Sequence, residues 1–232
     1  MFKQSAKSVE FFAFTLAEVL ITLGIIGIVA AMTIPALMNN TQDAQFKSAW
    51  KKEYSALSQA ALSIISENGS FKGVGGMYQH SKLRDVFADK LKYIKTCADA
   101  TSYGDCWIGG TYSAPLTKYL SGTNLANMDY IPLGSGSAGL VLTDGAFVIF
   151  AYQDPNCTSN AIPGPGSEGL SNICGWISVD VNGAKAPNTV GRDIFGVWVL
   201  DNKISPYGTL NYANTCNTSS SGMSCSAQYL SQ

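Results

Sequence analysis

The sequence predicts an α+β protein, in which one long N-terminal helix packs on a small antiparallel sheet. Three observations carry this prediction. An apolar run over residues 14–38 leads into an amphipathic pattern that continues to residue 68. After residue 69 the composition changes to Gly, Ser, Thr, Tyr and Asn, and short apolar runs alternate with turn residues. All six cysteines follow residue 90, as expected of a separate folded head.

The first 38 residues predict a short positive flank and a membrane-spanning half-helix. Residues 1–13 carry Lys3 and Lys7, the positive flank that stays in the cytoplasm. Residues 14–38 exceed the apolar core of a secretory signal, which spans roughly 7–15 residues. Glu18 is the one charged residue of this run. Because a carboxylate at mid-bilayer costs roughly 2.5–3.5 kcal/mol, Glu18 needs either a function or a shallow position.

Residues 39–68 are predicted to continue the helix as its amphipathic half. Apolar side chains recur there at helical spacing: Phe46, Trp50, Tyr54, Leu57, Ala61, Ile64 and Ile65. The opposite, polar face is expected to carry Lys47, Lys51, Lys52, Glu53 and Gln59. Asn68 and Gly69 are predicted to end the helix.

Three residues weaken the apolar half of this helix. Pro35 removes a backbone hydrogen bond and crowds the preceding turn, while Gly24 and Gly27 lower helix propensity. Two interpretations follow equally well. The helix bends or melts locally, or its small residues let neighbouring helices approach closely.

The head is predicted in two parts. Residues 69–139 form a variable connecting region, in which residues 83–94 are compatible with a helix. Residues 140–232 form the antiparallel sheet. Asp144-Gly145, between two apolar runs, predicts a tight hairpin turn with positive φ at both central residues. Two more apolar runs predict further strands, with turns at Asn182-Gly183 and Asp201-Asn202.

The cysteines predict disulfides formed in an oxidising compartment. Their number is even, their spacing is wide and they follow a membrane segment. Pairing of sequence neighbours is favoured because each bond then closes a short loop: Cys97 with Cys106, Cys157 with Cys174 and Cys216 with Cys225. The alternative is a set of free buried thiols, which behave as small hydrophobes.

Several function classes lack support. The net charge is −1 and no basic stripe is present, so a nucleic-acid partner is not expected. The G-x-G-x-x-G at residues 134–139 precedes a predicted strand and therefore makes no phosphate cradle. His80 is the single histidine and is expected in a solvated loop. No catalytic cluster is visible, so neither an enzyme nor an obligatory cofactor is predicted.

One segment of the head carries a metal hypothesis. Asp180, Asn182 and Asp193 offer the oxygen ligands that Ca²⁺ prefers, although their spacing is not that of an EF-hand. The alternative is a hairpin turn at Asn182-Gly183 followed by a loop that Pro187 makes rigid.

The N-terminal residues together resemble the processing and assembly signature of type IV pilins and of the pseudopilins of type II secretion. The basic leader is followed by the elements of this signature: Phe14, Thr15, Leu16, Glu18, Gly24, Gly27 and Pro35. The resemblance implies that a prepilin peptidase cleaves between Ala13 and Phe14 and methylates the new amine. Most members have glycine before the cut, where this chain has Ala13.

The resemblance also implies a function for Glu18. Its carboxylate would pair with the Phe14 amine of a neighbouring subunit during polymerisation. The alternative is that Glu18 reaches the headgroups and favours the positive end of the helix. The implied partners are other pilin or pseudopilin subunits, the peptidase, an inner-membrane assembly platform and lipid.

The expected location is a single pass of the inner membrane with the head outside the cytoplasm, and later a pilus or pseudopilus. Such a subunit would serve protein secretion or cell adhesion. A rival interpretation is a signal-anchored or exported ligand-binding protein that does not polymerise.

Overall fold

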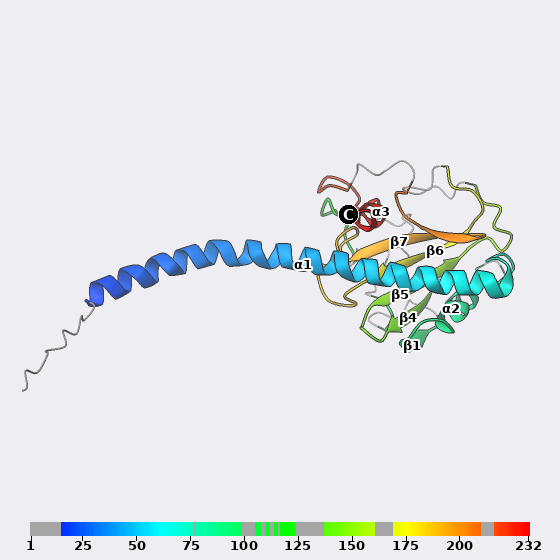
Figure 1. The fold of residues 1–232 in the computed structure, drawn as a ribbon, viewed down its shortest axis with the longest axis horizontal. Helices are drawn as coiled ribbons and strands as arrows, with labels where there is room; N and C mark the ends of the chain where they lie inside the picture. Colours follow the sequence, from blue (N-terminus) through cyan, green and yellow to red (C-terminus); the bar gives the residue numbers. More distant parts are fainter. Residues whose placement is uncertain are drawn as a thin grey trace, which may run out of the picture. The chain divides into compact units, whose positions relative to one another are not determined.

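The computed structural model describes residues 15–76, 78–98, 105–107, 110–111, 114–115, 117–123, 137–160, 169–209 and 216–232. The chain divides into two compact units, Met1–Gln42 and Asp43–Gln232. Helix α1 (Leu16–Asn68) contributes to both units, and every other element belongs to the second (Figure 1). The predicted α+β class, with a long N-terminal helix and an antiparallel sheet, is confirmed.

The main sheet has six antiparallel strands in the order β1-β4-β5-β6-β7-β8. Their bounds are β1 Tyr93–Cys97, β4 Ala138–Leu142, β5 Phe147–Tyr152, β6 Ile173–Asp180, β7 Ile194–Leu200 and β8 Lys203–Pro206. A separate pair joins β2 (Gly110–Thr111) to β3 (Ala114–Pro115). Because β4 to β8 pair in chain order, they form a meander.

Both faces of the main sheet are covered. In β7 the odd-numbered residues from 195 to 199 lie in one apolar cluster together with residues of α1 and of helix α2 (His80–Ala88). The even-numbered residues 194, 198 and 200 lie in a second cluster on the other face. All residues of β4 to β7 are therefore buried. This explains why these strands are apolar almost throughout rather than at every second position.

The second half of α1 covers one face of this sheet, as Figure 1 shows. The apolar positions predicted to face the core include four buried ones: Trp50, Leu57, Ala61 and Ile64. The Trp50 ring stacks on Phe195 of β7 with 4.8 Å between centroids. Its Nε1–H donates to the Ser226 carbonyl at 2.8 Å. One residue contradicts the predicted polar face, because Glu53 is only 3% exposed.

Helix α1 continues through Pro35 and ends where the sequence predicted. Gly69 adopts a φ of +82°, and its N–H donates to the carbonyl of Ile65 at 2.8 Å. Glycine favours this left-handed conformation after a helix because it has no Cβ.

The described part of the connecting region contains a helix and a strand of the main sheet. The helix predicted over residues 83–94 is correct only in its first part, because α2 ends at Ala88 and β1 begins at Tyr93. The reason is tertiary: β1 pairs with β4, with Lys95 opposite Val141. This pairing outweighs the local helical pattern. It adds a strand to the sheet that the sequence had not indicated.

The β4–β5 hairpin is confirmed, but the predicted turn type is wrong. The N–H of Gly145 donates to the Leu142 carbonyl at 3.0 Å, and the N–H of Leu142 donates to the Ala146 carbonyl at 2.9 Å. Of the two central residues, only Gly145 has positive φ, at +93°. The loop therefore needs one residue more than a primed two-residue turn.

The three predicted disulfides are confirmed. Cys97 at the end of β1 bonds to Cys106, Cys157 bonds to Cys174 of β6, and Cys216 bonds to Cys225 at the start of helix α3 (Cys225–Leu230). The separations along the chain are 9, 17 and 9 residues. Each bond thus braces a local loop of the head.

Candidate functional site

The predicted processing and assembly residues divide into two groups. Ala13 and Phe14 lie outside the described residues. Glu18 lies in the first turn of α1, where its Oε2 accepts the Thr15 backbone N–H and the Thr15 hydroxyl, both at 2.8 Å. The Glu18 N–H donates in return to Thr15 Oγ1 at 3.2 Å. This reciprocal pair is a capping box, and the Thr-x-x-Glu spacing in the sequence is its signature.

The remaining assembly residues line an exposed apolar helix. Over residues 16–38 of α1 the large apolar side chains lie open: Leu16, Val19, Leu20, Ile21, Leu23, Ile25, Ile26, Ile28, Val29, Met32, Ile34, Leu37 and Met38. A Cβ placed on Gly24 or Gly27 would meet no atom within 4 Å. By length and composition α1 could span a membrane. Exposed apolar surfaces of this size mark sites of contact with membranes or with other proteins.

The three candidate calcium ligands meet at the β6–β7 connection. Asp180 ends β6 and pairs with Ile194, the first residue of β7, so that Asp193 lies beside it at the end of the connection. Asn182 closes the turn, since its Nδ2 donates to the carbonyls of Lys185 and Ala186 at 3.0 and 3.1 Å. The turn at Asn182 and the group of three candidate ligands are thus features of the same segment.

Burial controls the charge of both aspartates. Desolvation raises the pKa of Asp180 well above its usual value, and the neighbouring charge of Asp193 adds to this effect. Desolvation also raises the pKa of Asp193 to about 6, although the backbone N–H groups of Thr189 and Asn188 donate to it at 2.6 and 2.8 Å. Within the described part of the chain, Asp180 Oδ2 and the Asn182 and Asn188 Oδ1 atoms are buried without a hydrogen-bond partner.

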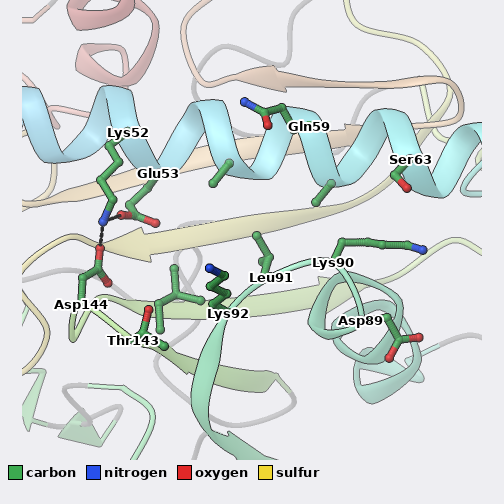
Figure 2. Close-up of a pocket in the computed structure, with 13 residues that line it drawn as sticks. Lys52, Glu53, Gln59, Ser63, Asp89, Lys90, Leu91, Lys92, Thr143 and Asp144 are labelled. Carbon is green, nitrogen blue, oxygen red and sulfur yellow. Dashed lines mark hydrogen bonds and ion pairs between the residues drawn. The ribbon is translucent and has the colours of Figure 1, made fainter.

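A groove of about 580 Å³ lies between three elements of the head (Figure 2). Helix α1 forms one wall, the α2–β1 connection another, and the β4–β5 turn closes one end. Small side chains on α1 make room for the groove. Leu91 and Leu142 line it with apolar surface. The charged residues that line the groove are Lys52, Glu53, Asp89, Lys90, Lys92 and Asp144.

At the closed end of the groove one lysine contacts two carboxyl groups, as Figure 2 shows. Lys52 Nζ lies 3.2 Å from Glu53 Oε1 and also donates to Asp144 Oδ2. Desolvation raises the pKa of Glu53 to about 7, because the carboxyl group is almost fully buried. Asp144 is partly exposed; despite some desolvation, hydrogen bonds from Glu53 and Lys52 lower its pKa to about 2. We call these three residues the Lys52 cluster.

For two residues, Glu53 and His80, the environment predicted from the sequence is wrong. The helical pattern predicts Glu53 on the polar face of the helix, but it lies on the buried side with Leu57 and Ala60. The sequence predicts His80 in a solvated loop, but His80 begins α2 and is half-buried, and its Nδ1 accepts the Tyr152 N–H at 2.8 Å. Helical spacing from Leu57 back to Glu53 was the available clue for the first.

Comparison of the chain with family models, with curated proteins and with solved structures finds no match.

Proposed function

We propose that this chain is a structural subunit of a type IV pilus or of a type II secretion pseudopilus. In this proposal it is processed before Phe14 and polymerises through its N-terminal helix. The observation that carries the proposal is the exposed apolar surface of α1 over residues 16–38, with Glu18 as its one charged residue.

That surface suits two successive environments. Before assembly it lies in lipid, where a helix satisfies all of its internal backbone hydrogen bonds. In the filament it packs against the same helix of other subunits, and the open positions at Gly24 and Gly27 permit close approach. The three disulfides agree with a head that matures outside the cytoplasm.

Glu18 has two functions in this proposal. In one chain its carboxylate caps the first turn of α1 through Thr15. During assembly the same carboxylate attracts the methylated Phe14 amine of a neighbour, because opposite charges interact strongly in a medium of low dielectric constant. Desolvation of both groups offsets part of this attraction.

The rival candidate is a membrane-anchored ligand-binding protein that never polymerises. The capping box favours it, because capping alone explains a carboxylate at this position. Under this alternative the negative charge of Glu18 has no intermolecular partner, and the two candidates therefore predict different effects of removing only that charge.

The decisive experiment compares Glu18→Gln with Thr15→Ala in the chain's own host. Glutamine keeps a capping oxygen but removes the charge, whereas Thr15→Ala weakens the cap and keeps the charge. We expect Glu18→Gln to abolish incorporation into sheared surface fibres and Thr15→Ala to retain most of it. The intact mass of the recovered protein should begin at methylated Phe14. A chain that begins at Met1, or equal incorporation of both variants, would contradict the proposal.

A second candidate function is calcium binding at the β6–β7 connection, and one observation favours it. Asp180 Oδ2 and Asn182 Oδ1 are buried without a hydrogen-bond partner in the described residues, and carboxylate and amide oxygens are what Ca²⁺ prefers. Asp180, Asn182 and Asp193 would hold the ion, which would supply the positive charge that two adjacent carboxylates need.

Calorimetry tests this candidate on the full chain in detergent. Calcium should give a binding heat and raise the melting temperature of the wild type. Asp180→Asn should lose both effects. Asp154→Asn is the matched control, because hydrogen bonds from Asn156 and Thr158 already occupy that carboxylate. Absence of heat with the wild type would remove the calcium site.

A further inference from the structure

The Lys52 cluster joins helix α1 to the β4–β5 turn. Lys52 and Glu53 lie on α1, and Asp144 lies in the turn (Figure 2). Glu53 is 3% exposed, and its Oε1 forms an ion pair with Lys52 Nζ at 3.2 Å. One exposed ammonium group thus serves two carboxyl groups. The charges of these three groups cancel when one of the two carboxyl groups carries a proton.

We propose that the Lys52 cluster is a proton-controlled latch, which holds the β4–β5 turn against α1 while Glu53 is protonated and releases it when Glu53 ionises. A protonated Glu53 can donate a hydrogen bond to the Asp144 carboxylate. An ionised Glu53 cannot donate, and it repels Asp144 across the end of the groove. The latch belongs to the head and is independent of filament assembly.

The other charges of the groove leave the cluster short of positive charge. Lys90 pairs with Glu67 at the far end of the groove, with 2.5 Å between Nζ and Oε1. Lys92 and Asp89, from the α2–β1 connection, are both exposed and offset each other in sign. Lys52 is therefore the cation placed against Glu53 and Asp144 in the described groove.

The expected pH window follows from the direction of the Glu53 shift. Burial raises the pKa of folded Glu53 from 4.5 to about 7. Between these values the unfolded chain has lost the proton and the folded chain retains it, so folding binds a proton. Stability from Glu53 is therefore complete below pH 4.5 and falls as pH rises toward 7. Above about pH 7 both states are ionised and the dependence ends.

The first test measures the unfolding equilibrium of the full chain in detergent as a function of pH. Within the window one proton changes the unfolding constant by about tenfold per pH unit. Asp180 and Asp193 have raised pKa values and contribute with the same sign, so variants are compared with the wild type. We expect Glu53→Gln to lower the slope by about one proton. Glu67→Gln, in an exposed ion pair, should leave the slope unchanged.

The second test reads the latch itself by hydrogen exchange at residues 142–146. After correction for intrinsic rates, exchange in the wild type should accelerate between pH 6 and 8 and stay constant in Glu53→Gln. Asp144→Asn keeps Glu53 but removes its charged neighbour, and should move the transition to lower pH. An unchanged slope in Glu53→Gln overturns the proposal. Loss of the slope without any change of exchange at the turn overturns the latch as well.

Discussion

His80 acts as a hydrogen-bond acceptor for the backbone of β5. Its Nδ1 accepts the N–H of Tyr152 at 2.8 Å, and the Tyr152 hydroxyl donates to the Phe71 carbonyl at 2.9 Å. Tyr152 is fully buried, so its N–H has no water to replace the imidazole. The side chains of His80 and Tyr152 thereby connect α2, β5 and the segment that follows α1.

Replacing His80 by alanine should destabilise the head by about 1–3 kcal/mol, the usual consequence of leaving a buried donor unsatisfied. His80→Asn is the control, because its Oδ1 can accept the same N–H and should recover most of the loss. Denaturant unfolding of the full chain in detergent measures both. Equal destabilisation by the two variants would show that ring packing, and not the hydrogen bond, matters.

The end of helix α1 illustrates how one element sets the path of the chain. Gly69 reverses the chain direction with a φ of +82°. Two residues later the N–H of Phe71 donates to the Asp201 carbonyl in the β7–β8 turn at 2.9 Å, and Phe71 is fully buried. The conformation at Gly69 thus positions a core side chain on the sheet.

Gly69→Ala should destabilise the head by roughly 1 kcal/mol, because alanine is strained at positive φ. Space is not the cause, since a Cβ at Gly69 would meet no atom within 4 Å. Ser66→Ala, an exposed change in the same last turns of α1, should be neutral or slightly stabilising. Thermal unfolding of both variants checks this, and an unaffected Gly69→Ala would be inconsistent with a strained helix end.

The chain consists of two units that differ in whether their apolar side chains are exposed or buried. Met1–Gln42 contains a helix whose apolar side chains are exposed, whereas Asp43–Gln232 contains both apolar clusters of the head. The earliest residue in either cluster is Trp50. The core of the head therefore does not depend on the apolar half of α1.

A chain of residues 43–232 should accordingly fold and unfold cooperatively without detergent when made in an oxidising compartment. A chain that begins at residue 58 is the control: it lacks Trp50, whose loss from a core typically costs about 3–5 kcal/mol, and should be largely unfolded. Circular dichroism and thermal unfolding of the two chains test this. Aggregation of residues 43–232 would mean that the head requires the apolar half of α1.

Local patterns predicted most of the fold because they report on one element at a time. Helical spacing predicted the buried face of α1, and Gly69 predicted where the helix ends. The preference for short loops predicted the three disulfides. Apart from the type of the Asp144-Gly145 turn, which is a local error, the failures involve partners distant in the chain. Residues 93–94 belong to a strand because β4 is available to pair with them, and Glu53 is buried because the sheet covers its side of the helix.

The sequence by itself determined the class of the fold, the apolar half-helix with its one carboxylate, and the residues that supply oxygen atoms to the β6–β7 connection. Composition and periodicity are properties of neighbouring residues, and these features depend on nothing more. Only the tertiary structure brought Asp144 to Lys52 and Glu53 and gave His80 its hydrogen-bond partner. It also buried Asp180 Oδ2 without a hydrogen-bond partner among the described residues. Charge states depend on desolvation and on groups far away in the chain, and folding alone decides both.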